Sequence, residues 1–292
     1  MARSMETKQL GKTGIFVSAI GLGGMPMSIS NRPPESQSIQ VIHRALDLGI
    51  TFIDTADSYC KDESDKHHNE QLIHKALSSY KGDISQVIVA TKGGLMRPNG
   101  SWTSNGNPEH LRQTIRVSFE ALGGAKPIDV WQYHSPDTHY TIEESLAPVK
   151  EAVEAGLIRF VGVSNFSVEQ IKRALDVVDI VSVQNQYSPW QRQPENDGVL
   201  KYCEQQGLTF LPWSPFGGRR RHQDLQDIRA IAQLAKEKGV SVYNIVLAWL
   251  RSKSPAILPI PGASKVSSIE DSAQAINVKL SDEEVQKIDR AT

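Results

Sequence analysis

The regular alternation of apolar runs with helix-forming segments constrains the fold of this chain more than any other feature. Apolar runs typical of strands recur eight times, and each precedes at least one segment with helical periodicity. The expected strands are 19–22, 52–54, 87–90, 129–133, 158–163, 180–183, 208–211 and 256–260, and the expected helices are 36–48, 69–79, 108–122, 142–155, 167–175, 196–205, 224–238, 241–252, 267–275 and 281–290. Such alternation predicts a parallel sheet covered by helices. Eight units without a linker favour a closed (β/α)8 TIM barrel over an open doubly wound sheet, in a single domain of residues 1–292 that opens with a short β-hairpin at 8–17.

Charge and cysteine content narrow the class of protein. The chain has 292 residues, with 32 Lys and Arg against 33 Asp and Glu, so its net charge is -1 and no overall field favours nucleic acid or a membrane. Two cysteines, Cys60 and Cys203, provide no disulfide framework, as expected in a reducing cytosol. No apolar run approaches the roughly 18 residues of a membrane span, and the N-terminus lacks the apolar core of a secretion signal. We therefore expect a cytoplasmic protein with small-molecule ligands.

Four polar residues stand where neighbouring strands are expected to end. Asp54 ends the second expected strand, Lys92 follows the third, His134 follows the fourth, and Tyr59 lies in the loop beyond Asp54. Because the carboxyl ends of barrel strands meet at one face, we expect these side chains to converge. One such residue would be an ordinary surface group, but four from neighbouring strands indicate a site. The later strands add Ser164, Asn165, Gln184, Trp213 and Ser214 at the same face.

The four residues form a set suited to proton transfer to a carbonyl oxygen. A free tyrosine, with a pKa of about 10, is a poor acid at neutral pH. An ammonium such as Lys92 favours the phenolate, so we expect it to lower the pKa of Tyr59. Asp54 would fix the ammonium, and His134 could orient the substrate oxygen. Reduction of a carbonyl also needs a hydride, so a reducing cofactor is required.

These motifs resemble those of the aldo-keto reductase family. The similarity rests on segments 52–59 (FIDTADSY), 90–92 (ATK), 132–134 (QYH), 163–166 (VSNF), 183–184 (VQ) and 260–265 (IPGASK), in the family's order and over nearly the whole chain. It implies a (β/α)8 barrel that binds NADPH, less often NADH, without a Rossmann domain. It also implies that Tyr59 is the general acid, that Asp54 and Lys92 tune it, and that His134 orients the carbonyl. Independently, the segment 21–24 (GLGG) is no dinucleotide fingerprint, because Pro26 stands where the third glycine belongs.

The resemblance further implies which residues hold the nicotinamide and the pyrophosphate. Ser164, Asn165 and Gln184 would bind the carboxamide, and Trp213 would stack on the ring. The residues expected along the pyrophosphate are Ser214, Phe216 and Gly217, and those expected to border the cofactor elsewhere are Gly24, Met25 and Asp54. The basic run 219–222 suggests a loop that closes over the phosphates, with a solvated charge run as the alternative.

The segment before the last barrel helix suits an anion, because a helix N-terminus offers free N–H groups and a positive dipole end. The residues expected at this end of the cofactor are Gly262, Ser264, Lys265, Ser268, Asp271 and Ser272. Many NADPH-specific members of the family have an arginine at the position of Ser268 and a Glu-Asn pair where Asp271 and Ser272 stand. Serine cannot fork onto a 2′-phosphate as arginine does. We therefore expect Ser264 and Lys265 to hold this phosphate and Asp271 to contact the adenine edge, with NADPH as the cofactor and NADH as the alternative.

The substrate pocket is expected on the loops above the strand ends. Its predicted members are Met25, Tyr59, Trp102 and His134, with Met27 and Trp190 as further candidates. Trp102 could offer a flat surface to an aromatic aldehyde. The family's activity is the reduction of aldehydes, and of some ketones, to alcohols, and its commonest form is a monomer.

Two alternatives remain at this point. Some barrels of this type, such as potassium-channel β-subunits, act mainly as cofactor-bound partners of another protein, and only the lack of an added interaction segment favours the enzyme. The pair His67 and His68, beside Asn69 and Glu70, could suggest a metal site. No further ligand spacing supports one, so we expect a solvated loop there and no metal.

Overall fold

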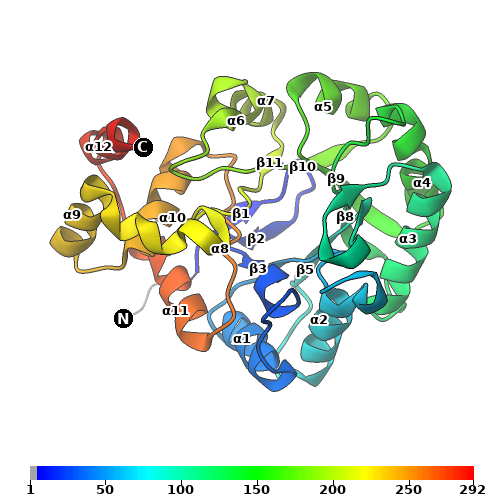
Figure 1. Cartoon of the computed structure of the whole chain (residues 1–292), viewed down its shortest axis with the longest axis horizontal. Coiled ribbons are helices and arrows are strands. Elements are labelled where there is room, and N and C mark those ends of the chain that lie inside the picture. Colours follow the sequence, from blue (N-terminus) through cyan, green and yellow to red (C-terminus); the bar gives the residue numbers. More distant parts are fainter. Residues whose placement is uncertain (1–4) are drawn as a thin grey trace.

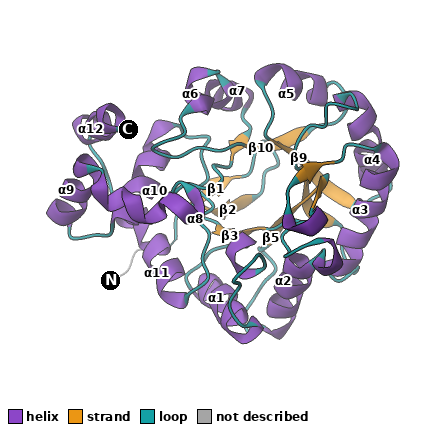
Figure 2. Ribbon diagram, viewed as in Figure 1, coloured by secondary structure: helices purple, strands orange, loops and turns teal. Residues whose placement is uncertain are grey.

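Parallel strands inside a ring of helices form the body of the computed structural model, which describes residues 5–292 (Figure 1). Seven strands form one parallel sheet, in the spatial order β11 (Thr209–Phe210), β10 (Ile180–Gln184), β9 (Ile158–Ser164), β8 (Ile128–Tyr133), β5 (Ile88–Gly93), β4 (Phe52–Asp54) and β3 (Leu22–Gly23). The helices that follow successive strands are α1 (Glu35–Asp47), α2 (His68–Ser79), α3 (Pro108–Ala121), α4 (Ile142–Glu154), α5 (Val168–Leu175), α7 (Val199–Gln206) and α10 (Val242–Lys253), and α11 (Val266–Gln274) completes the ring. Figure 2 shows these helices outside the strands on all sides.

The sheet closes into a barrel through residues 256–260, which occupy the eighth strand position. On one side the N–H of Gly21 donates to the carbonyl of Pro259 at 2.8 Å, and on the other the N–H of Leu258 donates to the carbonyl of Phe210 at 2.9 Å. The regular strand predicted at this position is wrong, because Pro259 has no N–H to continue a ladder. Isolated bridges close the barrel instead. The predicted (β/α)8 class is thereby confirmed.

The hairpin predicted at 8–17 is present as β1 (Thr7–Gln9) and β2 (Phe16–Ser18), and it covers the amino-terminal end of the barrel. Leu10 and Val17 are fully buried and pack among inward-facing strand residues such as Phe52. Because this end is filled, the carboxyl ends of the strands are the face at which a ligand can meet the barrel.

The sequence marks several helix starts clearly. Three helices, α4, α5 and the C-terminal α12 (Asp282–Ala291), begin with a capping box, in which two side chains satisfy the first free N–H groups. The predicted starts at 142, 167 and 281 lie within one residue of the observed ones.

Other bounds differ from the prediction. The helix expected over 224–238 begins only at α9 (Arg229–Lys238), after a 3-10 turn at His222–Asp227. The one expected over 196–205 begins only at α7, after Gly198, whose φ is 82°, and a separate short helix, α6 (Gln193–Asn196), precedes it. A small hairpin, β6 (Leu95–Met96) and β7 (Thr103–Ser104), and the short α8 (Gly218–Arg221) were absent from the expected elements.

Helix α12 packs on α9 and α10 at one side of the barrel, at the left of Figure 1. Within residues 5–292, no helix has the length and apolar character needed to cross a membrane.

Candidate active site

The four strand-end residues meet at the carboxyl face of the barrel. Asp54 ends β4, Lys92 lies near the end of the neighbouring β5, and His134 directly follows β8, the next strand in the sheet. Tyr59 turns back over β4 from the loop behind Asp54. All four side chains are buried, Lys92 completely.

The Lys92 ammonium is the centre of this group. Its nitrogen donates to Oδ2 of Asp54 at 2.7 Å, to the hydroxyl oxygen of Tyr59 at 2.9 Å and to the main-chain carbonyl of Thr55 at 2.8 Å. An ammonium has three hydrogens, so each one has an acceptor. Lys92 is therefore held in one position with its charge against the phenol.

The second oxygen of Asp54 is held by two glutamines. The side-chain nitrogen of Gln184 donates to Oδ1 at 2.8 Å, and that of Gln132 does so at 3.4 Å. Gln132 was not predicted to be a site residue, because it falls inside an expected strand with aromatic neighbours. A polar side chain within such a strand was nevertheless a signal, since a buried amide must find a partner.

His134 faces the same space as Tyr59. Their rings lie 5.9 Å apart, edge to face, and the Ser58 hydroxyl lies 3.4 Å from Nδ1 of the imidazole. No group in the described chain bonds to Nε2, so this nitrogen can meet a substrate oxygen. A donating Ser58 hydroxyl places the ring proton on Nε2.

Burial decides the protonation states of these groups. Burial, reinforced by Asp54, raises the pKa of Tyr59 well above its ordinary value. The predicted lowering of this pKa is therefore wrong in direction, because desolvation penalises the phenolate. Burial also lowers the pKa of Lys92, and burial together with Lys92 lowers the pKa of His134 well below its usual range. At neutral pH the site thus holds a protonated phenol and a neutral imidazole.

The residues predicted at the nicotinamide form a chain of hydrogen bonds beside His134. The side-chain amide of Asn165 donates to the His134 carbonyl at 3.0 Å and to the Ser164 hydroxyl at 3.2 Å, and its oxygen accepts from the Trp213 indole at 3.0 Å. Asn165 has a φ of 62°, a conformation that asparagine tolerates better than most residues. This chain brings the ends of β8 and β9 together with the loop after β11.

The loop predicted along the pyrophosphate contains three residues with a left-handed backbone. Ser214, Gly217 and Gly218 have φ values of 51°, 77° and 76°. The N–H of Gly217 already donates to the carbonyl of Ser214 at 2.9 Å, so contact of this loop with phosphate oxygens stays a prediction. Phe216 anchors the loop by packing edge to face on Tyr243, with ring centroids 5.0 Å apart. In the basic run that follows, the side chains of residues 219 and 220 lie outside the described part of the chain, so the predicted closure over the phosphates stays a prediction.

The N-terminus of α11 has the chemistry expected for an anion. Its cap residue Lys265 makes no side-chain capping bond, so the first N–H groups of the helix are not satisfied by the cap. The carbonyl of Ser264 accepts from Gln37, and the side chain of Ser268, in the first turn, is exposed. These features fit the phosphate end of a dinucleotide.

The other residues predicted to contact the cofactor near α11 already bond to or pack against the protein itself. The Asp271 carboxylate accepts from the Ser241 hydroxyl at 2.7 Å and from the Asn244 amide at 2.9 Å, and Ser272 is buried. Gly262 packs against the Pro26 ring so closely that a Cβ would lie 2.7 Å from it. Contact of Asp271 with adenine stays a prediction.

The loop after β3 approaches the site through glycine. A Cβ on Gly24 would lie 2.3 Å from Oδ1 of Asn69 and 2.9 Å from the Asp54 carbonyl, so only glycine fits. Met25, the next residue, is partly exposed. Met27 is buried in the outer core at 1% exposure, so its predicted place in the substrate pocket is wrong.

Trp102 forms an open wall of the site. Its ring lies edge-on to those of Tyr59 and His134, each at 6.5 Å, and it is 45% exposed. Arg97, which the sequence did not single out, lies 3.7 Å from the centre of this ring and donates to the carbonyl of Gly100 at 2.8 Å. The other predicted tryptophan, Trp190, lies instead beside Gly217 in the loop after β11.

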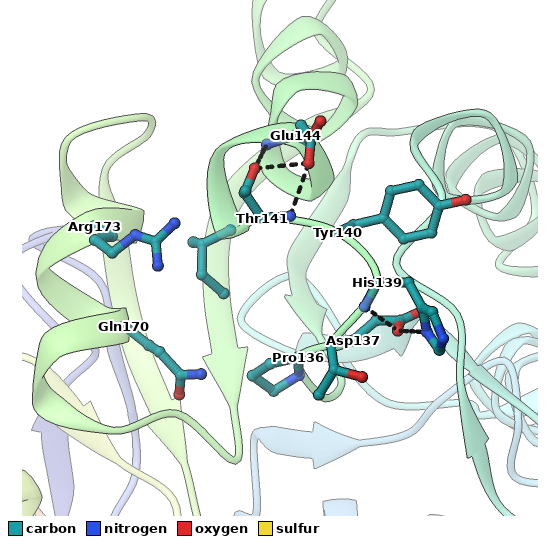
Figure 3. A pocket seen from close by; sticks show the side chains of 10 residues that line it. Pro136, Asp137, His139, Tyr140, Thr141, Glu144, Gln170 and Arg173 are labelled. Carbon is teal, nitrogen blue, oxygen red and sulfur yellow. Dashed lines mark hydrogen bonds and ion pairs between the residues drawn. The ribbon is translucent and has the colours of Figure 1, made fainter.

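An open pocket of about 340 Å³, which none of the four strand-end residues lines, lies between the loop after β8 and helices α4 and α5 (Figure 3). Its carboxylates already have partners: Asp137 accepts from His139, and Glu144 closes the capping box with Thr141. It offers no comparable set of reactive groups.

Known proteins place this geometry in context. A model of the aldo/keto reductase family matches residues 19–292. An uncharacterized oxidoreductase of Schizosaccharomyces pombe is 37% identical over an alignment of 281 positions, which covers 94% of this chain and 87% of that protein. A solved structure of a thermostable aldo-keto reductase in complex with the inhibitor epalrestat matches with a TM-score of 0.84 at 28% identity, covering 99% of this chain and 100% of the other. An aldo/keto reductase from Klebsiella pneumoniae in complex with NADP and acetate has the same fold, with a TM-score of 0.82 at 24% identity and coverage of 98% and 95%.

Proposed function

This chain belongs to the aldo/keto reductase family of oxidoreductases. We propose that it uses NADPH to reduce aldehydes, and some ketones, to alcohols. The single observation that carries this proposal is the buried Lys92 ammonium, which contacts the Asp54 carboxylate and the Tyr59 hydroxyl at once. At the open end of the barrel, a protonated phenol can donate its proton to a substrate, and the adjacent ammonium stabilises the phenolate that remains.

Tyr59 is the general acid in this proposal. Its high pKa keeps the phenol protonated at neutral pH, so the proton is present when a carbonyl arrives. The hydroxyl donates this proton to the carbonyl oxygen as negative charge develops there. Lys92 then stabilises the phenolate that remains, and Asp54 holds Lys92 in place.

His134 orients the carbonyl. The imidazole is neutral because burial and Lys92 lower its pKa, and its Nε2 carries the proton when Ser58 donates to Nδ1. Nε2–H and the Tyr59 hydroxyl then offer two donors to one carbonyl oxygen. Trp102 presents its exposed face beside them, which suits flat, aromatic aldehydes.

A nicotinamide dinucleotide, when bound, supplies the hydride. Ser164, Asn165 and Gln184 would hold its carboxamide end, with Trp213 stacked on the ring. The residues proposed along the phosphates and the adenosine are Ser214, Phe216, Gly217, Gly262, Ser264, Lys265, Ser268, Asp271 and Ser272, and those proposed beside the rest of the cofactor are Gly24, Met25 and Asp54. NADPH is proposed over NADH because a lysine and uncapped N–H groups stand at the start of α11. The Klebsiella protein's complex with NADP is consistent with this choice.

The test is NADPH-dependent turnover of a panel of aromatic, aliphatic and sugar-derived aldehydes and simple ketones, followed by the loss of NADPH absorbance and repeated with NADH. We expect consumption of NADPH with at least one class of aldehyde and a lower kcat/KM with NADH. Tight NADPH binding without turnover of any carbonyl would refute the reductase and would favour the cofactor-bound partner protein. We further propose a cytoplasmic monomer, which light scattering of the purified protein and its location in cell fractions would test.

A further inference from the structure

Two carboxylates that the mechanism above does not use are buried next to Lys92. Asp57, two residues before Tyr59, and Glu70, in α2, are both fully buried. The solvated loop predicted at 67–70 is wrong, because Glu70 and its neighbour Asn69 point into the protein. Buried carboxylates are costly, so their presence requires an explanation.

Each carboxylate has a basic partner. The nitrogen of Lys66 lies 3.2 Å from Oδ2 of Asp57, and Nδ1 of His67 lies 2.6 Å from Oε2 of Glu70. The N–H of His67 also donates to the Asp57 carbonyl at 2.7 Å, which joins the two pairs. We call Asp57, Lys66, His67 and Glu70 the carboxylate cluster.

Two contacts connect the carboxylate cluster to the strand that carries Lys92. The N–H of Asp57 donates to the Lys92 carbonyl at 3.0 Å, and the hydroxyl of Thr91 donates to Oε1 of Glu70. Neither oxygen of the Asp57 carboxylate has a hydrogen-bond partner among residues 5–292. Lys66 is therefore the one group that pairs with the Asp57 carboxylate among the described residues, and no hydrogen bond offsets the electric field of this carboxylate at Lys92.

Lys92 needs that negative charge. Full burial favours the neutral amine and lowers the pKa of Lys92, whereas Asp54, Asp57 and Glu70 all favour the ammonium. Charges in a buried site interact over longer distances than charges in water, because little solvent or salt screens them. Asp57 and Glu70 can therefore act on Lys92 without touching its nitrogen.

We propose that Asp57 and Glu70 are positioning residues for the reductase reaction proposed above: they keep Lys92 protonated without touching substrate or cofactor. The titratable groups beside Lys92 are Asp54, Tyr59 and His134. Those that face Asp57 and Glu70 are the cluster's own Lys66 and His67 and, around the cluster, Cys60, Glu63 and His110. Without the two carboxylates, Lys92 loses its proton at a lower pH, and the phenolate left by proton transfer loses its counter-charge.

The direct test measures the titration midpoint of Lys92 by NMR, in the full chain labelled with [ε-13C]lysine. The signal of Lys92 is the one that Lys92→Met removes. We expect Glu70→Gln and Asp57→Asn each to lower this midpoint by about one pH unit, the effect of one charge several ångströms away in a buried site. The alkaline limb of kcat/KM should move in the same direction by a similar amount.

Two controls separate charge from structure. Thr91→Val breaks the hydrogen bond to Glu70 but keeps its charge, so the Lys92 midpoint should stay in place. Lys8, which donates to the carbonyls of Pro255 and Ile257 and has a pKa lowered to about 8 by burial, titrates beyond the reach of the cluster and should be constant in every variant.

The outcomes are distinct. A lower Lys92 midpoint in Glu70→Gln and Asp57→Asn, with Thr91→Val unchanged, supports the proposal. An unmoved midpoint in both variants, or an equal shift in Thr91→Val, overturns it and leaves the cluster a structural role only. Because the NMR titration needs no turnover, a wild-type protein that reduces no carbonyl would refute the proposed function without deciding this electrostatic effect.

Discussion

Replacement of Asp57 by asparagine should stabilise the protein at neutral pH. Burial raises the pKa of this carboxyl from 3.8 to about 6, against the opposing charge of Lys66. A difference of about two pKa units corresponds to about 3 kcal/mol of unfavourable free energy for the ionised group in the folded state. Asparagine has nearly the same shape and no charge, so this penalty disappears in Asp57→Asn.

The sign of the pH dependence follows from the raised pKa. The folded state binds the Asp57 proton more tightly than the unfolded state does, so its contribution to stability is complete below pH 3.8 and is lost as the pH rises through about 6. The wild type should therefore lose stability over this range relative to Asp57→Asn. The pKa of about 6 already includes the attraction of Lys66, so we expect a net gain near pH 7.5 of about 2–3 kcal/mol.

The assay is urea unfolding of both proteins at about pH 4.5 and about pH 7.5, followed by circular dichroism. The pH-dependent contributions of all other titratable groups to the free energy of unfolding cancel when the two proteins are compared. Asp57→Asn should have the higher urea midpoint at the upper pH and a clearly smaller advantage at the lower one. A variant that is less stable at the upper pH, or a difference that does not change with pH, would refute the reasoning.

Three further predictions concern the site. Lys92→Met leaves a buried carboxylate without its cation and should cost about 3–5 kcal/mol, measured by urea unfolding; a loss below about 1 kcal/mol would show that the pair is not held as the structure has it. Gly24→Ala places a Cβ 2.3 Å from the Asn69 side chain and should lower stability by about 1–3 kcal/mol, whereas an unchanged melting temperature would mean that this loop can shift freely. Lys265→Met should raise the Kd for NADPH about tenfold and leave that for NADH nearly constant, as measured by fluorescence titration; equal effects on both cofactors would place the 2′-phosphate elsewhere.

Much of the fold and the centre of the site were predictable because strand ends carry a simple signal. Asp54, Lys92 and His134 each follow an apolar run, and barrel geometry brings such residues to one face whatever the loops do. The capping boxes fixed helix starts in the same way. The eighth strand was harder, since Pro259 interrupts its ladder and the segment is held by isolated bridges.

Properties that depend on burial could not be predicted. The direction of the Tyr59 pKa is set by desolvation, which a sequence does not show. A glutamate such as Glu70 is expected at the surface from the sequence alone, and only the packing of α2 against the barrel shows that it is buried. Arg97 was missed because its role comes from a stack on Trp102 across a loop whose hairpin the sequence did not reveal.

The most direct test of the account is Tyr59→Phe, which removes one oxygen and leaves the rest of the ring. We expect kcat for aldehyde reduction to fall by roughly 10²–10⁴ while the Kd for NADPH changes little, because the substitution removes the proton donor and one acceptor of Lys92 but no residue proposed to hold the cofactor. Tyr80→Phe, at a half-buried tyrosine that donates to Asp47 away from the site, is the matched control and should keep full activity. Tyr59→Phe with wild-type turnover would contradict the account, since the proton would then come from another group.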